Sequence, residues 1–303
     1  MLIAIDHGNY AIKTPNFTFV SGLVESNVPH AIQEGTLSYN DKYYALTETR
    51  LTYRRDKTAD ESFFILTLFA IGKELERMKK AKEYVSIDLA VGLPPQHYGV
   101  LKEKFANYFK RNGMISFNYN LNQYYITINR VMVFPQSYSA VVPKSEMILK
   151  QSRVFIVDIG GYTTDILLLH NGKPDLSFCK SLDNGIITMN NELINKVNVL
   201  YDMRIDDELI TEVLSGQETT LPEEVVHEIE AAADNHTKMI LGKFKEMGID
   251  LRVIKTVFVG GGSILLKRFI INTPQLSQSL FIEEQNANAL GYQMLGRAQL
   301  LKG

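Results

Sequence analysis

Short apolar runs alternate with amphipathic stretches along the chain, and this pattern predicts a mixed α/β fold. The apolar run from Val154 to Val157 indicates a buried strand that ends at Asp158. After a glycine turn, a second apolar run continues from Ile166 to Leu169. Two such runs around a short glycine turn predict a β-hairpin.

A similar pattern opens the chain. Leu2 to Ile5 indicates a short strand, Asp6-His7-Gly8-Asn9 a turn, and Tyr10 to Lys13 the way out of that turn. Asp6 and Asp158 therefore occupy corresponding positions in the two halves. This repeat predicts a duplicated fold in which each half offers one turn to the same ligand.

The rest of the chain contains further strands and helices at short spacing, without a low-complexity segment or an obvious flexible linker. The expected helices are residues 98–111, 186–201, 206–214, 222–247, 264–271 and 286–301, with another that starts near residue 60. The expected strands are residues 17–20, 42–46, 85–91, 115–119, 124–133, 176–181, 256–259 and 280–282.

One polar segment, Leu51 to Asp60, stands between a strand and a helix and is rich in basic residues, among them Arg54 and Lys57. We expect a solvated loop here, and a nucleic-acid or filament contact is the alternative.

Composition narrows the class of protein. With 45% hydrophobic residues, the 303-residue chain can bury a large core. The formal net charge of −2 gives no general attraction to nucleic acid, so a role on DNA would require a partner protein. The single cysteine, Cys179, excludes an internal disulfide. No apolar run reaches the roughly 18 residues of a membrane span, and the N-terminus lacks a signal-peptide pattern. We therefore expect a soluble, cytoplasmic protein.

The glycine turns suggest phosphate chemistry. Glycine has no Cβ, so its backbone N–H groups can approach a phosphate chain closely. The alternative for the second turn is an ordinary surface hairpin. A third element supports the phosphate hypothesis, because the strand 256–259 runs into Gly260-Gly261-Gly262-Ser263 before an expected helix. A glycine turn in this place suits close approach to a ribose, an adenine face or a phosphate.

These motifs together resemble the superfamily of actin, Hsp70 and sugar kinases, and within it the actin-like ParM type used in plasmid segregation. Residues 6–13 resemble its first phosphate motif, residues 158–165 its second and residues 257–263 its adenosine motif. Pro135-Gln136 resembles the first connecting segment and residues 287–292 the second. The five motifs occur in the expected order and span nearly the whole chain.

The resemblance implies an actin-like duplicated two-lobe α/β fold, with mixed sheets flanked by helices and a nucleotide cleft between the lobes. Lobe I would comprise residues 1–148, with residues 272–303 returning to it, and lobe II residues 149–271. It further implies an ATPase that binds ATP or ADP with Mg²⁺ and polymerises into a filament of identical subunits. Its partner would be a DNA-binding adaptor protein on plasmid DNA, and no direct membrane contact is expected.

The resemblance also assigns roles to individual residues. Gly8, Asn9, Gly160, Gly161 and Thr163 would contact the phosphates, with Lys13 as a point charge on the β- and γ-phosphates. Asp6 and Asp158 would hold Mg²⁺ through water. Gln136 would orient the attacking water, and Asp158 would polarise it. The adenosine pocket would use Gly185, Gly260, Gly261, Gly262 and Ser263. His7 is expected to be a satisfied turn histidine, with a phosphate contact as the alternative.

Two other functions share these motifs. A sugar or acetate kinase would need a catalytic carboxylate and a substrate pocket, and no such signal occurs between residues 14 and 130. A scaffold of the FtsA type would be expected to carry an amphipathic C-terminal tail, and residues 291–303 offer little of this kind.

Overall fold

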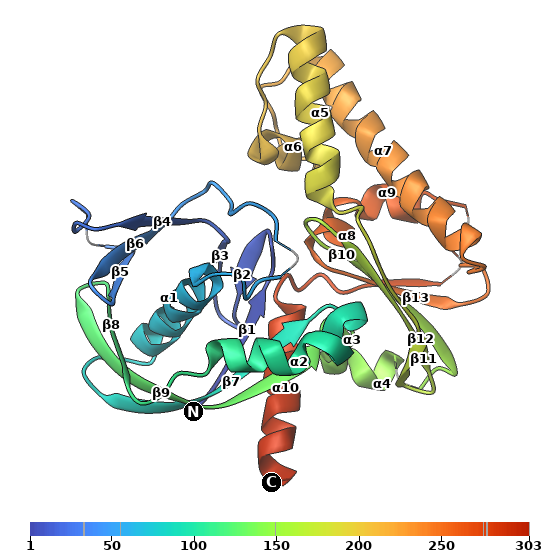
Figure 1. Cartoon of the computed structure of the whole chain (residues 1–303). Coiled ribbons are helices and arrows are strands. Elements are labelled where there is room, and N and C mark those ends of the chain that lie inside the picture. The colour runs from blue at the N-terminus through green and yellow to red at the C-terminus, as the bar shows by residue number, and fades with distance from the viewer. Residues whose placement is uncertain (33, 55, 149, 275, 277, 303) are drawn as a thin grey trace. The chain divides into compact units, whose positions relative to one another are not determined.

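The computed structural model describes residues 1–32, 34–54, 56–148, 150–274, 276 and 278–302. The chain forms two compact units. Unit 1 contains Met1–Pro143 together with the segment that starts at Asn286, and unit 2 contains Lys144–Gln285. Each unit is built on its own β-sheet (Figure 1).

The sheet of unit 1 has nine strands among the described residues, in the order β3-β2-β1-β7-β9-β8-β5-β6-β4. Its strands are β1 (Leu2–His7), β2 (Ala11–Lys13), β3 (Thr18–Val20), β4 (Leu23–Ser26), β5 (Thr36–Tyr39), β6 (Lys42–Leu46), β7 (Tyr84–Leu93), β8 (Ile115–Tyr119) and β9 (Asn122–Pro135). Its helices are α1 (Ser62–Arg77), α2 (Pro95–Phe109), α3 (Tyr138–Val141) and α10 (Ala287–Lys302). A 3₁₀ turn, Val142–Lys144, ends this first part of the chain.

The sheet of unit 2 has five strands among the described residues, in the order β12-β11-β10-β13-β14. Its strands are β10 (Arg153–Ile159), β11 (Thr164–His170), β12 (Lys173–Leu182), β13 (Lys255–Val259) and β14 (Ser279–Phe281). Its helices are α4 (Ser145–Ile148), α5 (Ile186–Tyr201), α6 (Asp207–Leu214), α7 (Glu223–Glu246), α8 (Gly261–Leu265) and α9 (Lys267–Ile271). In Figure 1, α5 and α7 run alongside each other, and α6 lies next to them.

The two sheets share one arrangement. In unit 1, β1, β2 and β3 form antiparallel pairs, and β7 and β9 then add to β1 in parallel. In unit 2, β10, β11 and β12 form antiparallel pairs, and β13 and β14 then add to β10 in parallel. The structure therefore confirms both the α/β class and the internal repeat predicted from the sequence.

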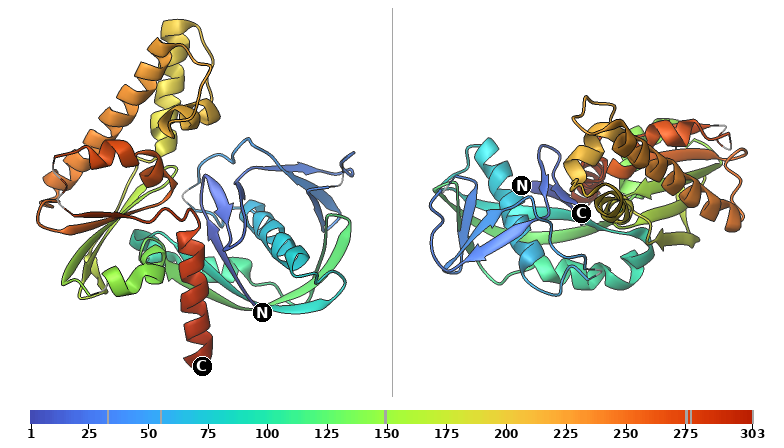
Figure 2. Two further views of the ribbon diagram at one scale, coloured as in Figure 1. Left: turned by 180° about the vertical axis from the view of Figure 1, so that it is seen from behind. Right: turned by 90° about the horizontal axis from the view of Figure 1, so that it is seen from above.

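Helix α1 carries much of the core of unit 1, because most of its residues from Phe63 to Leu75 are buried. In Figure 1 it lies in the concave side of the curved sheet. Helix α10 packs against β1 and α3 of the same unit, and the view from behind in Figure 2 shows it beside β1. The core of unit 2 lies between its sheet and the helices α5, α6 and α7.

Some local predictions differ from the structure. The helix predicted for residues 264–271 is two short helices, α8 and α9, that meet at Leu266. The turn between β8 and β9 lies at Asn120 and Leu121, which both adopt positive φ, so β9 begins at Asn122, two residues before the predicted strand 124–133. Strand β4 was missed. Residues 272–285, predicted to return to lobe I, lie in unit 2, because β14 extends the sheet by pairing with β13.

Candidate functional site

The first glycine turn joins β1 to β2 in unit 1. Asp6 and Lys13 are directly opposite each other in this antiparallel pair, so their side chains project from the same face. The Asp6 carboxylate is buried, and its Oδ1 accepts a hydrogen bond of 2.7 Å from Nε2 of Gln136. Three predicted site residues, Asp6, Lys13 and Gln136, are therefore brought together.

Gln136 is held at the end of β9 by the backbone around it. Its N–H donates to the carbonyl of Leu93, 2.8 Å away. The next residue, Ser137, is buried and has a φ of 61°, a strained conformation for a side chain of this kind. The N–H of Ser137 donates to Oδ1 of Asn288 at 3.0 Å, so the first and second connecting segments meet directly.

Tyr292 is a residue near the site that the sequence prediction left without a role. Its hydroxyl lies 3.4 Å from Oδ1 of Asp6. A Cβ on Gly92 would overlap this hydroxyl, which explains the need for glycine in β7. Tyr292 lies in a segment that the resemblance singled out, but only the fold shows that its side chain reaches Asp6.

His7 belongs to the core of unit 1. Its ring is fully buried and stacks on Phe109 at a centroid distance of 4.9 Å. Thr67 donates its only hydroxyl proton to the carbonyl of Phe63, so Nε2 of His7 must be the donor in its 2.8 Å bond to Thr67. Burial, reinforced by the charge of Lys57, lowers the pKa of His7 to about 3. A neutral, enclosed ring of this kind fits a structural role.

Carbonyl groups in and next to the first turn accept hydrogen bonds from residues elsewhere in the chain. The Lys57 ammonium donates to the carbonyl of His7, and the Ser21 hydroxyl donates to that of Gly8 at 2.7 Å. The Ser21 N–H donates to the carbonyl of Tyr10 at 3.1 Å. Neither Lys57 nor Ser21 was predicted from the sequence, and no local pattern marks them.

This arrangement leaves two backbone N–H groups of the turn without a hydrogen-bond partner among the described residues, those of Gly8 and Asn9. In a trans peptide the C=O of one residue and the N–H of the next point to opposite sides. The bonds to His7 and Gly8 therefore direct the N–H groups of Gly8 and Asn9 away from Lys57 and Ser21. Neither N–H has a hydrogen-bond partner among the described residues. A Cβ on Gly8 would also lie only 2.5 Å from the carbonyl oxygen of Ala11, so no larger residue fits here.

The second glycine turn joins β10 to β11 in unit 2. The predicted hairpin is present, and Asp158 and Asp165 are directly opposite each other. Both carboxylates are buried and share one face of the sheet. Two like charges in this position repel each other unless a cation lies nearby. The hydroxyl of Thr163 contacts Oδ2 of Asp165 at 3.3 Å.

Helix α5 begins directly against this second turn. The backbone N–H groups of Gly185, Ile186 and Ile187 donate to the carbonyls of Tyr162, Gly160 and Gly161, at 3.0, 3.1 and 2.7 Å. By the same peptide geometry, the N–H groups that follow these carbonyls point away from α5. Those of Gly161 and Thr163 have no partner among the described residues. A Cβ on Gly185 would overlap the carbonyl of Gly161, so glycine permits this contact.

The third glycine motif packs against the second turn. Gly260 has a φ of +87°, and a Cβ there would overlap Oδ1 of Asp158. A Cβ on Gly262 would lie 2.6 Å from the side chain of Ile159. The hydroxyl of Ser263 is fully buried and has no hydrogen-bond partner among the described residues. The predicted residues of unit 2, Asp158, Gly160, Gly161, Thr163, Gly185 and Gly260 to Ser263, thus form one local cluster.

The donor set fits a polyphosphate better than a directly bound metal. Free N–H groups at both turns suit anionic oxygens. Among the described residues, no group of three or more His, Cys, Asp or Glu side chains could hold a metal ion. Mg²⁺ commonly keeps several water ligands, so the role of Asp6 and of Asp158 in holding it stays a prediction. The described residues also contain no helix that is long and apolar enough to cross a membrane.

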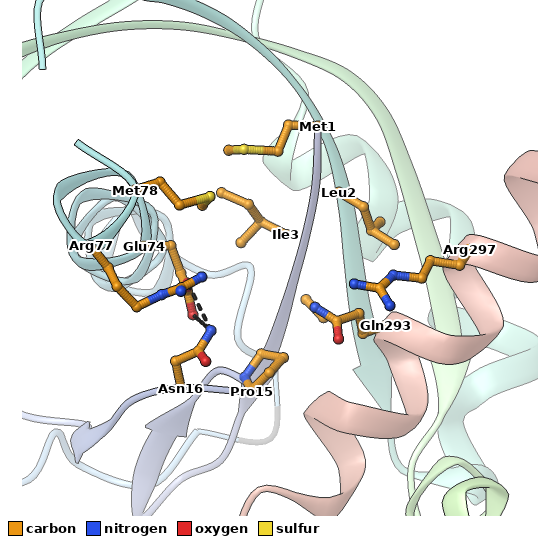
Figure 3. A pocket seen from close by; sticks show the side chains of 11 residues that line it. Met1, Leu2, Ile3, Pro15, Asn16, Glu74, Arg77, Met78, Gln293 and Arg297 are labelled. Atoms are coloured by element: carbon orange, nitrogen blue, oxygen red, sulfur yellow. Dashed lines mark hydrogen bonds and ion pairs between the residues drawn. The ribbon is translucent and has the colours of Figure 1, made fainter. Parts of the chain in front are cut away.

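A separate cavity of about 290 Å³ lies in unit 1 (Figure 3). Its walls come from the start of β1, the end of α1, the Pro15-Asn16 loop and α10, and none of the predicted site residues lines it. Inside, the buried Glu74 accepts hydrogen bonds from Thr14 at 2.6 Å and from Asn16 at 2.9 and 3.0 Å, and pairs with Arg77. This carboxylate is satisfied and stabilises the helix end and the loop.

Comparison with known proteins identifies both halves of the chain. Residues 4–138 match the family model of the actin like proteins N terminal domain, and residues 156–271 match that of the archaeal actin homologue MreB-like, C-terminal. No curated protein matches the chain in a search of such proteins.

Solved structures agree with the family models. The native structure of Ta0583, an archaeal actin homologue, is 21% identical, with a TM-score of 0.75 over 98% of this chain and 99% of the other. A 15-stranded ParM filament from Clostridium botulinum is 17% identical, with a TM-score of 0.78 over 98% and 99%. Bacillus thuringiensis ParM with ATP is 13% identical, with a TM-score of 0.70 over 99% of both chains. At these identities the likeness establishes the fold, and the roles of the site residues stay predictions.

Proposed function

We propose that this chain, which belongs to the actin-like proteins, binds and hydrolyses ATP at its glycine turns and uses that cycle to assemble and disassemble a filament. One observation carries the proposal. In both turns, carbonyl groups accept hydrogen bonds from neighbouring segments, and the N–H groups of the same peptides point away from those segments. Four of these N–H groups, those of Gly8, Asn9, Gly161 and Thr163, have no partner among the described residues. Such preorganised donors suit the phosphate groups of a nucleotide.

Relatives with the same fold support the choice of ligand and of assembly. Ta0583 has been solved in complex with ADP, and Bacillus thuringiensis ParM with ATP. The ParM of Clostridium botulinum forms a filament. Similarity to these proteins favours ATP and self-association for the chain described here.

Within this proposal each residue has a defined task. Gly8, Asn9, Gly160, Gly161 and Thr163 bind phosphate oxygens through N–H and side-chain donors, and Lys13 adds a positive charge. The Gln136 amide donates to Asp6 through Nε2, because a carboxylate oxygen accepts only. Its Oε1 is then left to accept a hydrogen bond from the attacking water and to orient it. Asp158 polarises that water.

Mg²⁺, when bound, neutralises the charge of the phosphate chain. Asp6 and Asp158 would hold it through water ligands. The facing carboxylates of Asp158 and Asp165 fit this role, because a nearby cation removes their mutual repulsion. Gly185 and Gly260 to Ser263 would line the adenosine, and the unpartnered hydroxyl of Ser263 fits a polar ligand.

The cellular use follows from the resemblance to the ParM type. The filament would separate plasmid DNA in the cytoplasm through a DNA-binding adaptor protein, without direct membrane contact. The formal net charge of −2 fits an adaptor, because the chain lacks a general attraction to DNA.

The test combines sedimentation and light scattering with phosphate release, for protein in Mg²⁺ with ATP, with ADP or without nucleotide. We expect scattering that rises with ATP and decays as phosphate appears. Gln136→Ala should slow phosphate release at least tenfold and leave ATP affinity nearly unchanged, while the exposed Gln123→Ala serves as a control. No assembly at any concentration, with turnover that depends on an added small acceptor, would replace this proposal with a kinase.

A further inference from the structure

The basic segment between β6 and α1 contacts the first glycine turn and two residues that follow it, Tyr10 and Ser21. Lys57 donates to the carbonyl of His7, and the Leu51 N–H donates to the carbonyl of Ser21 at 2.8 Å. The Arg50 guanidinium lies over the ring of Tyr10, 5.0 Å from its centroid. The expectation of a merely solvated loop is therefore wrong for the side of this segment that faces the turn.

The loop that carries Lys57 is held by side-chain contacts on both sides of this residue. On one side, Asp56 accepts hydrogen bonds from Thr58, at 2.6 Å from its hydroxyl and 2.9 Å from its N–H, and from Lys104 of α2 at 2.5 Å. These bonds lower the pKa of Asp56 to about 2, so it stays ionised at neutral pH. On the other side, the hydroxyl of Tyr108 donates to the carbonyl of Asp60 at 2.7 Å. These bonds hold the loop on both sides of Lys57, and its ammonium contacts the carbonyl of His7 from that loop.

Lys57 and Ser21 act on consecutive peptide groups. Lys57 holds the peptide between His7 and Gly8, and Ser21 holds the peptide between Gly8 and Asn9. If either donor is lost, its peptide can rotate, and a carbonyl can then face the place where an N–H should receive a phosphate. A carbonyl oxygen repels phosphate, so rotation both removes a donor and adds a repulsion.

We infer that Lys57 is a positioning residue that holds the first phosphate turn in its binding conformation, with Ser21 as its partner, and that it couples phosphate binding to the 50–60 segment. The inference rests on the proposed ATP binding. Lys57 acts through the backbone of the turn and requires no contact with the nucleotide. Loss of its charge-assisted bond weakens ATP binding but leaves the catalytic groups Gln136 and Asp158 in place.

The experiment measures ATP affinity and phosphate release of the full chain in Mg²⁺ for Lys57→Met, Lys57→Arg and Arg54→Met. Arg54 is the matched control, because it lies on the same loop and carries the same charge but pairs with Asp60 instead of the turn. We expect Lys57→Met to raise KM for ATP about tenfold with kcat changed less than twofold. Lys57→Arg, which keeps a cationic donor, should recover to within about threefold, and Arg54→Met should match wild type.

The outcomes separate this inference from the proposed function. If the wild type neither binds nor hydrolyses ATP, the proposed function fails and the inference falls with it. If the wild type binds and hydrolyses ATP while Lys57→Met and Arg54→Met behave alike, the inference alone is overturned. A fall in kcat with unchanged KM would also overturn it, because it would place Lys57 in the chemistry.

Hydrogen exchange of the wild type provides a test that does not depend on any variant folding. On addition of ATP and Mg²⁺, we expect slower amide exchange in residues 7–10 and also in residues 50–60. Protection confined to residues 7–10 would show that the loop is not coupled to the turn.

Discussion

The carbonyl groups of the two glycine turns are held by different kinds of donor. In the second turn, three carbonyls are held by three backbone N–H groups at the start of α5. In the first turn, two of the three occupied carbonyls depend on side chains, Lys57 and Ser21. The N–H groups of α5 exist as long as the helix exists, whatever its side chains are. The first turn can be weakened by a single substitution that leaves its strands intact.

Because of this difference, we expect substitutions near the two turns to have different effects. The second turn lies against the start of α5, whose partial positive charge would favour the phosphate binding proposed above. The first turn is linked through Lys57 and Leu51 to a surface segment, so its conformation can respond to what contacts that segment. We expect substitutions around the second turn to affect folding and chemistry together, and those around the first to affect mainly affinity.

The largest effect is expected at Asp158. Asp158→Ala should still bind ATP but should release phosphate at least about 100-fold more slowly, because metal and water positioning are lost. Steady-state phosphate release and equilibrium ATP binding measure the two quantities. The exposed Asp183→Ala is the control. Hydrolysis at the wild-type rate would remove Asp158 from the mechanism.

Gly185→Ala should break the support of the second turn. The new Cβ would overlap the carbonyl of Gly161, so either the turn or the start of α5 must shift. We expect unit 2 to lose about 1–3 kcal/mol of stability and ATP affinity to fall about tenfold or more. Urea unfolding and ATP binding test this. Gly242→Ala is a suitable control, because a Cβ there meets no atom within 4 Å. Equal behaviour of the two variants would mean that the turn tolerates displacement from α5.

His7 should make the base of the first turn sensitive to acid. Its folded pKa of about 3 lies below its ordinary value of 6.5, so between these two values the unfolded state binds a proton that the folded state does not. Above pH 6.5, the protonation of His7 does not reduce the free energy of unfolding. Between pH 6.5 and about 3, this free energy falls by about 1.4 kcal/mol per pH unit. Urea unfolding at pH 7.0 and 5.5 should show a larger loss of stability in wild type than in His7→Phe, which keeps the contribution of His236, whose pKa is also lowered by burial. The same pH dependence in both proteins would contradict the prediction.

The smallest effect is expected at Ser21. Ser21→Ala removes a neutral hydrogen bond to the turn and should weaken ATP binding about threefold, clearly less than Lys57→Met. Fluorescence titration with a labelled ATP analogue would measure it, with the half-buried Ser26→Ala of β4 as control. A larger effect than that of Lys57→Met would assign the main support of the first turn to the hydroxyl.

Much of the local structure could be predicted because its causes are local. The apolar runs of β1 and β10 end at Asp6 and Asp158, and both turns follow as expected. Helix α5 covers the predicted residues 186–201. The α8 and α9 region was less predictable, because a break of one residue at Leu266 leaves almost no trace in the apolar spacing.

The sequence by itself determined the α/β class, the internal repeat and the glycine motifs, because periodicity and turn chemistry act between neighbours along the chain. Only the tertiary structure decided what supports those motifs. Gln136 and Tyr292 reach Asp6 across 130 and 286 positions, and Lys57 reaches His7 across 50. A serine or lysine that holds a distant carbonyl has no distinctive neighbours in sequence, since its role depends on which backbone group the fold brings within hydrogen-bond distance.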